Sequence, residues 1–288
     1  MIVMPYYSSG DLIHYITKDF YNIKWYTKLG KLSSIANGLL QIHKLNIIHR
    51  DFHSRNIFFD ENIINLRFNY RFINSVTIGD LGISKSATES GDDNNNENYG
   101  IIPYMAPEVL QGRKYTKASD MYSFGMIMWV LMTGRRPFWD RNHDTELIIE
   151  ICDGLRPPIV TNAPEGYIEL MEECWHSDPD KRPQITDIEE RIDKINSKER
   201  NLIRYKNKPT EIIESSDIGP VTKNNPGAIY KSRPLSAMIN SAMSLRSSRS
   251  QSINLEKVKR KFEDGLIEDI NDNGMIFKIM QVNLIDKL

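Results

Sequence analysis

The chain has 288 residues, of which 40% are hydrophobic and 26% charged, and this composition is typical of a folded globular protein. Its formal net charge of −1 excludes a general electrostatic attraction to nucleic acid or to an anionic membrane. Two cysteines are too few for a disulfide framework, and the longest apolar run, residues 124–132, is far shorter than the ~20 residues of a membrane span. With no basic, cleavable leader at the start, these features predict a soluble intracellular protein of the cytoplasm.

The first twenty residues predict a short strand, a turn and a short helix. Ile2-Val3-Met4 is the apolar strand, residues 5–10 form the turn, and residues 11–16 form the helix. A strand this close to the start of a domain needs partners. We therefore expect that the domain has lost sequence upstream of residue 1, and a native edge strand is the alternative.

Apolar residues recur at helical spacing from Trp25 to Leu40, which predicts an amphipathic helix that ends near His43. Residues 57–59 and 76–78 predict two strands, joined by a long polar and aromatic connection. The turn at residues 79–82 follows the second strand, and residues 86–98 are polar without periodicity, which predicts a mobile loop.

The segment from Thr116 to Met132 predicts a helix that is apolar on all sides and therefore buried at the centre of the domain. Three further helices are predicted near residues 144–152, 166–174 and 186–195. Beyond residue 200 the composition changes. Between residues 230 and 261 there are eight Lys or Arg and eight Ser against one acidic residue, which predicts a disordered basic tail.

Three side chains in this order can support metal and proton chemistry. Asp51 lies in the loop after the first long helix, Asn56 follows five residues later, and Asp80 lies at the turn after the second strand. Carboxylate and amide oxygens can hold Mg²⁺, and a carboxylate can polarise a hydroxyl group.

The motifs around these residues resemble those of a known family. His49-Arg50-Asp51-x-x-x-x-Asn56, Asp80-Leu81-Gly82 and Ala106-Pro107-Glu108 occur in kinase order. Over residues 1–197 the chain resembles the C-terminal lobe of a eukaryotic protein kinase of the tyrosine-kinase-like group. The resemblance implies an α+β fold, mainly α, with a small β-hairpin region at the active site. It also implies that residues 1–197 hold the hinge and C-terminal lobe, and the composition predicts that residues 198–288 form a largely disordered tail.

The resemblance implies a role for each residue of the catalytic loop. Asp51 would orient the acceptor hydroxyl and take its proton, and Asn56 and Asp80 would bind Mg²⁺, with Asp80 bridging it to the phosphates of ATP. His49 and Arg50 complete the motif. In the family, an Arg beside the catalytic Asp implies control by charge on the activation segment.

The resemblance also implies where ATP would bind. Met4 falls at the gatekeeper position, and Pro5 and Tyr7 would offer backbone groups to adenine. Phe58 would form the floor beneath the base, and Asp11 would reach the ribose. A plain strand and turn is the alternative for these individual contacts.

Three residues are expected to hold the scaffold rather than to act on substrate. In the family, Glu108 pairs with the Arg before the last helix, here Arg182, and Asp120 accepts hydrogen bonds from the catalytic-loop backbone. Cys174 is expected to be a packed core residue rather than a reactive thiol.

The sequence also departs from the family pattern, since it holds no Gly-rich loop and no strand lysine to grip the phosphates. Two functions therefore stay open. The first is an ATP-dependent protein kinase in intracellular signalling that acts on protein substrates, with Ser/Thr as the expected acceptor and Tyr as the alternative. The second is a catalytically impaired scaffold or binding module.

We expect protein partners only, including docking partners for the basic, serine-rich tail, and no nucleic-acid or membrane partner. The basic stretch lacks the interleaved aromatic residues of a nucleic-acid binder, which makes that function the weakest candidate.

Overall fold

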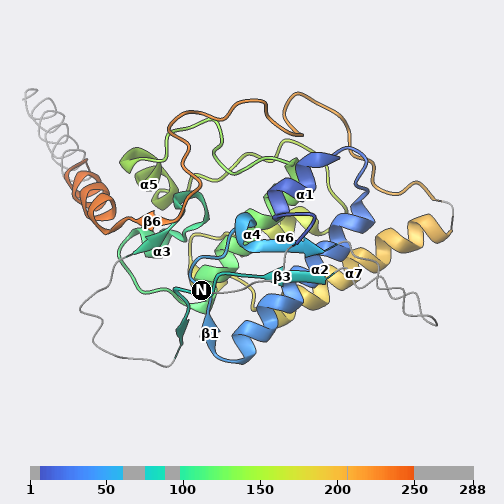
Figure 1. Cartoon of the computed structure of the whole chain (residues 1–288), viewed down its shortest axis with the longest axis horizontal. Coiled ribbons are helices and arrows are strands. Elements are labelled where there is room, and N and C mark those ends of the chain that lie inside the picture. The colour runs from blue at the N-terminus through green and yellow to red at the C-terminus, as the bar shows by residue number, and fades with distance from the viewer. Residues whose placement is uncertain (1–6, 61–74, 88–97, 206, 250–288) are drawn as a thin grey trace, which may run out of the picture. The chain divides into compact units, whose positions relative to one another are not determined.

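The computed structural model describes residues 7–60, 75–87, 98–205 and 207–249 (Figure 1). The chain forms two compact units, residues 1–242 and residues 243–288, and the described part of the second, residues 243–249, is helical. The described residues of the first unit are mainly helical with three small sheets, so the predicted α+β, mainly α fold is confirmed. No helix in the described ranges is long and apolar enough to cross a membrane.

The N-terminal part of the unit has two helices that lead to the loop that holds Asp51. Helix α1 spans Leu12–Lys18, and its first turn is capped by the side chain of Asp11, which accepts a hydrogen bond from the His14 amide at 2.8 Å. Helix α2 spans Trp25–Lys44, as the apolar periodicity predicts, and its buried face packs against the last helix, α7. The predicted strand at residues 2–4 lies outside the described residues.

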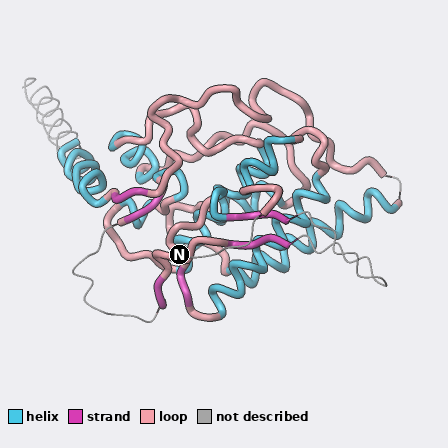
Figure 2. Tube along the Cα trace, viewed as in Figure 1, coloured by secondary structure: helices cyan, strands magenta, loops and turns pink. Residues whose placement is uncertain are grey.

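Each sheet has two antiparallel strands (Figure 2). Strands β2 (Ile57–Asp60) and β3 (Ser75–Ile78) form the predicted hairpin region, with Ile57 opposite Ile78. Strand β1 (Ile47–Ile48) pairs with β4 (Lys85–Ser86). Strand β5 (Tyr99–Gly100) pairs with β6 (Arg233–Pro234), which comes from the C-terminal segment.

Helix α4 (Lys117–Thr133) runs through the centre of the unit and is buried on all sides from Ser119 onward, as predicted. Thr116 and Ser119 form a capping box at its start, and Gly134 ends it in the left-handed conformation (φ 72°). Gly125 lets α6 approach, since a Cβ at this position would lie 3.0 Å from the Cβ of Cys174. Cys174 itself is fully buried, which confirms it as a core residue.

Six short 3₁₀ and α-helices and the long helix α7 complete the described part of the lobe around α4. They are η1 (Ser54–Asn56), η2 (Ile102–Tyr104), α3 (Pro107–Leu110), α5 (Thr145–Cys152), α6 (Tyr167–Cys174), η3 (Pro179–Lys181) and α7 (Ile185–Arg204). The three predicted helices correspond to α5, α6 and α7.

The compact unit extends beyond the expected boundary at residue 197. Helix α7 continues to Arg204 because no Gly or Pro interrupts it before Pro209, and its buried face continues to Glu199. The Glu199 carboxylate then accepts hydrogen bonds from the backbone amide and hydroxyl of Thr210, at 2.7 and 3.0 Å, which turns the chain back.

Residues 207–242 pack on the lobe, where the composition led us to expect a largely disordered tail. Apolar side chains at intervals along this stretch are buried, namely Ile218, Tyr230, Leu235, Ile239 and Ala242. Backbone hydrogen bonds join the segment to the end of α4 and to the loop that follows it, including the Gly219 amide to the Thr133 carbonyl at 2.7 Å. The average composition of the segment does not reveal these buried side chains. Residues 236–249, which include the low-complexity stretch around Arg246, are helical.

Candidate active site

The buried carboxylate of Asp120, in the first turn of α4, organises the catalytic loop. Its Oδ2 accepts hydrogen bonds from the His49 amide at 2.8 Å and from Nε2 of His43 at 2.9 Å, and its Oδ1 accepts one from the Arg50 amide at 3.0 Å. Arg50 is in the left-handed region (φ 72°), which is unfavourable for an L-residue with a side chain. The Asp120 contacts therefore hold the loop in a strained conformation just before Asp51 and confirm the predicted scaffold role.

His49 links the catalytic loop to the turn that carries Asp80. Its Nε2 donates to the Gly79 carbonyl at 3.1 Å, and the ring is fully buried. Burial lowers the pKa of His49, although the Asp120 carboxylate acts to raise it. The lowered pKa favours the neutral ring. The guanidinium of Arg50 lies 4.8 Å from the centre of the Tyr115 ring.

Asp51 is a buried carboxylate with two side-chain partners. Its Oδ2 accepts a hydrogen bond from the Ser232 hydroxyl at 2.6 Å, and its Oδ1 lies 3.4 Å from Nε2 of His53. Burial alone would raise the pKa of Asp51, but the contacts with His53 and Ser232 outweigh it and leave that pKa below its ordinary value. The carboxylate is therefore ionised at neutral pH and can accept a proton from a hydroxyl group.

Asn56 and Asp80 lie at the same end of the β2–β3 hairpin. The Gly79 amide donates to the Asn56 carbonyl at 2.8 Å, which fixes the Asp80 turn beside Asn56. The Asn56 side chain donates through Nδ2 to the Asp51 carbonyl at 2.9 Å, so its oxygen is the atom left for a metal. Asp80 is exposed, and its carboxylate accepts from the Gly82 amide at 3.3 Å. One amide and one carboxylate oxygen fit Mg²⁺, which binds few protein groups and completes its shell with phosphates and water.

The residues expected to contact the nucleotide are only partly within the described ranges. Tyr7 stacks on Phe58 with ring centres 5.4 Å apart, and Asp11 forms a backbone bridge to Phe58 while capping α1. These three residues therefore lie together next to β2. Met4 and Pro5 lie outside the described residues.

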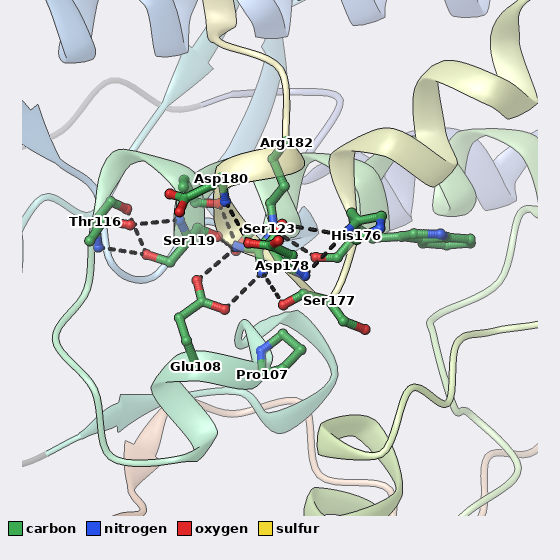
Figure 3. Close-up of polar contacts among 12 residues, drawn as sticks. Pro107, Glu108, Thr116, Ser119, Ser123, His176, Ser177, Asp178, Asp180 and Arg182 are labelled. Atoms are coloured by element: carbon green, nitrogen blue, oxygen red, sulfur yellow. Dashed lines mark hydrogen bonds and ion pairs between the residues drawn. The ribbon is translucent and has the colours of Figure 1, made fainter.

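Arg182, the residue after η3, is paired with Glu108 in α3 (Figure 3). Its guanidinium makes two hydrogen bonds to the carboxylate of Glu108, both at 2.7 Å, and its Nε donates to the His176 carbonyl at 2.8 Å. Both side chains are almost fully buried. The predicted ion pair is confirmed.

Sequence reasoning missed two residues of the site. His43 was assigned only as the end of α2, although it shares the Asp120 carboxylate with the catalytic loop. Ser232 was assigned to the disordered tail, although its hydroxyl lies on Asp51. The local sequence signal at Ser232 is its position between two basic residues, Lys231 and Arg233, and that pattern does not identify a contact 181 residues away.

Comparison with known proteins identifies the class. Residues 1–192 match the family model described as protein tyrosine and serine/threonine kinase, and the chain therefore belongs to this family. The resemblance to eukaryotic protein kinases of the tyrosine-kinase-like group is thereby confirmed. The enzyme class of this family is protein kinase, a phosphotransferase.

Relatives come from different branches of the family. A probable serine/threonine-protein kinase of Dictyostelium discoideum is 33% identical over 203 residues, which cover 67% of this chain and 13% of that protein. Ephrin type-A receptor 6 of Rattus norvegicus is 30% identical over 198 residues, or 68% of this chain and 18% of the receptor. A putative serine/threonine-protein kinase/receptor of Acanthamoeba polyphaga mimivirus is 32% identical over 193 residues, 66% and 11% of the two chains. This chain thus spans less than a fifth of the length of each of these three relatives.

Proposed function

We propose that this chain carries the base and metal half of an ATP- and Mg²⁺-dependent protein kinase that phosphorylates serine or threonine in protein substrates. The observation that carries the proposal is the hydrogen bond between a serine hydroxyl and the ionised carboxylate of Asp51. The catalytic residues are Asp51, Asn56, Asp80, His49 and Arg50, with Asn56 and Asp80 as the metal ligands.

The roles follow from the contacts of each group. Asp51 takes the proton of the acceptor hydroxyl, and His53 keeps its carboxylate oriented. When bound, Mg²⁺ neutralises charge on the transferred phosphate, and Asn56 and Asp80 hold it at the end of the β2–β3 hairpin. His49 keeps the Asp80 turn in register with the catalytic loop through the Gly79 carbonyl.

We propose the adenine site beside β2, made by Met4, Pro5, Tyr7 and Phe58, with Asp11 toward the ribose. The stacked rings of Tyr7 and Phe58 support this assignment, since an aromatic surface suits a planar base.

The choice of serine or threonine rests on the distance between the acceptor's backbone and its hydroxyl group. The Ser232 hydroxyl meets Asp51 from a backbone that continues directly into β6, which is paired with β5. A tyrosine hydroxyl extends several ångström farther from its backbone and would need a strand at a greater distance from Asp51. The family description covers both acceptors, so tyrosine is the alternative outcome.

The test is transfer of phosphate from Mg-ATP to a peptide library that offers Ser, Thr and Tyr acceptors. Asp51→Asn removes the base and is expected to lower kcat by about 10²–10⁴-fold. Asp187→Asn, an exposed first-turn acid of α7, is the matched control and should leave kcat unchanged.

A second readout separates binding from transfer. Mg-ATP should raise the melting temperature of the wild type, and Asp80→Asn should remove the Mg²⁺-dependent part of the shift. A chain that binds Mg-ATP without transferring phosphate would instead be the catalytically impaired scaffold.

We further propose an intracellular, cytoplasmic signalling role for the protein and a kinase domain that covers residues 1–197. The near-neutral charge and the lack of a disulfide framework support this location. Cell fractionation that recovers the protein with the membrane pellet would contradict it.

A further inference from the structure

Residues 228–235, here called the returning segment, lie on the face of the lobe that carries Asp51. The segment is held at several points along its length. The Tyr230 hydroxyl donates to the Pro137 carbonyl at 2.7 Å, and the Tyr230 carbonyl accepts from Nη1 of Arg55 at 2.9 Å. Nη2 of Arg233 donates to the His143 carbonyl at 2.9 Å. Tyr230 is 7% exposed and Leu235 1%, so the segment is seated in the lobe rather than lying over it.

Backbone pairing fixes the register of the returning segment. Tyr99 is opposite Pro234 and Gly100 is opposite Arg233 in the β5–β6 sheet, and the Leu235 amide donates to the Asn98 carbonyl at 2.7 Å. Figure 1 shows β6, in orange, arriving at this place from the far end of the sequence. Addition of a strand to an exposed edge is a common way to bind an extended peptide, because main-chain hydrogen bonds hold it and single side chains project into sites.

The side chain that this register directs to the base is Ser232. Its hydroxyl donates to Asp51 Oδ2 at 2.6 Å and lies 3.4 Å from Nε2 of His53. A hydroxyl within about 2.6–3.2 Å of a general base is in the position from which a proton is abstracted. Ser236, four residues farther on, is used differently, because its oxygen accepts a hydrogen bond from the Asn98 amide and holds the backbone.

We propose that the returning segment occupies the protein-substrate groove of this kinase lobe and presents Ser232 as an intramolecular phosphoacceptor. The proposal rests on the proposed function and adds the substrate. Ser232 Oγ forms a bond to the γ-phosphorus of ATP while Asp51 takes its proton. The bond from that phosphorus to the β,γ-bridging oxygen breaks, and its electron pair leaves with ADP. The product is phosphoserine at position 232.

Phosphorylation changes the charge of the groove. A phosphoserine carries about −1.5 to −2 charges at neutral pH, and here it would face the buried carboxylate of Asp51. Like-charge repulsion therefore releases the segment and opens the groove to other substrates. Before modification the same segment competes with them.

The test uses the full chain with Mg-ATP, and mass spectrometry locates and quantifies phosphate. Ser232 should become phosphorylated with a first-order rate constant that is independent of protein concentration, because acceptor and base are in one chain. Arg233→Ala loosens the segment and should lower this rate roughly fivefold to tenfold. Ser241→Ala, which alters an exposed hydroxyl bonded within its own helix, is the control and should leave the rate unchanged.

Hydrogen–deuterium exchange supplies a readout that needs no transfer. Amides of residues 98–100, 230–233 and 235 should be protected in the wild type and in Ser232→Ala. Ser232→Glu should increase their exchange by about tenfold or more, since it places a negative charge against Asp51. The same variant should phosphorylate a separate acceptor peptide faster than the wild type does.

The outcomes are distinct. If the peptide library is phosphorylated and Ser232 is not, the inference is overturned while the proposed function stands. If neither is phosphorylated, the proposed function fails and the acceptor role fails with it. Unprotected amides in the returning segment would overturn the inference regardless of the transfer data.

Discussion

At the scale of single residues, Lys28 is an ionisable group buried away from the active site. Its amino group is buried without a hydrogen-bond partner and lies 3.8 Å from the centre of the Phe20 ring and 5.3 Å from that of Trp25. Burial lowers the pKa of Lys28 from 10.5 to about 7. Attraction to the aromatic rings offsets only part of the lost hydration.

The lowered pKa predicts a pH-dependent stability. Between pH 7 and 10.5 the unfolded chain binds more protons at Lys28 than the folded chain, so this group makes the free energy of unfolding rise with pH across that window. Lys28→Met should therefore stabilise the protein at pH 7, by roughly 2–4 kcal/mol, since one pKa unit corresponds to about 1.4 kcal/mol. Urea unfolding at pH 7 and pH 9 should show that the free energy of unfolding changes less with pH in Lys28→Met than in the wild type.

Lys24→Met is the control, because Lys24 is exposed at the N-terminal end of the same helix. It should leave both the stability and the pH slope as in the wild type. A Lys28→Met variant that is less stable than the wild type at pH 7 would contradict the prediction and would assign a net favourable role to the ammonium group on the rings.

The single residues that sequence could identify are those fixed by local motifs. Asp51, Asn56 and Asp80 stand at set spacings, and Asp120 stands in the first turn of a helix whose body, residues 124–132, is apolar. Ser232 could not be identified, because its position depends on the pairing of β6 with β5. Long-range contacts of this kind have no periodic signal in the chain.

At the scale of elements, the N-terminal turn of α4 supports the catalytic loop through Asp120. Asp120→Asn would replace one of the two acceptor oxygens with an NH2 group, which cannot accept, so either the Arg50 amide or the His49 amide and His43 would lose their partner. We expect a loss of about 2–4 kcal/mol in the free energy of unfolding, because a charge-assisted buried hydrogen bond is worth roughly 1.5–3 kcal/mol. Catalytic activity should fall as well, since the strained Arg50 backbone would relax.

The matched control is Asp187→Asn, which changes the first-turn acid of α7 where it is exposed. Its effect on stability should stay within about 0.5 kcal/mol. Thermal and urea unfolding measure stability, and exchange of the amides at residues 49 and 50 reports the loop directly. Equal effects of the two substitutions would refute the supporting role of Asp120.

Helices were predictable at this scale and short strands were not. The apolar periodicity placed α2, α4, α5 and α6 to within a few residues of their ends. Strands β1, β4, β5 and β6 are each two residues long, and they exist only through their partners. Pairing between distant segments leaves no alternation to detect in two residues.

At the scale of the whole molecule, the Glu108–Arg182 pair joins the activation segment to the region before α7. Removing one partner of a buried pair leaves an uncompensated charge, so Arg182→Met should cost about 3–5 kcal/mol in the free energy of unfolding. Arg191 forms a similar two-bond pair with Glu173, but at an exposed place. Arg191→Met should cost at most about 1 kcal/mol.

Urea unfolding of the two Arg→Met variants tests this contrast directly. The substitutions remove the same atoms, so the difference between them reports burial rather than side-chain chemistry. Equal losses would show that the buried pair is no better placed than the exposed one.

The extent of the compact unit was the largest feature beyond the reach of the sequence. The family motifs end near Arg182, and the polar composition after residue 200 gave no sign of a packed segment. The structure anchors residues 207–242 through a few buried side chains and through backbone contacts to loops that are distant in sequence. Composition averages over such anchors, which is why it predicted disorder here.

These anchors make the C-terminal segment part of the cooperative unit, which yields the last prediction. Leu235→Ala removes a side chain that is 1% exposed and should lower the free energy of unfolding by about 2–4 kcal/mol. Ile213→Ala removes a similar number of atoms from a side chain that is 65% exposed and should change stability by no more than about 0.5 kcal/mol. Both variants should retain a single unfolding transition. A Leu235→Ala protein as stable as the wild type would show that residues 207–242 contribute nothing to the stability of the lobe.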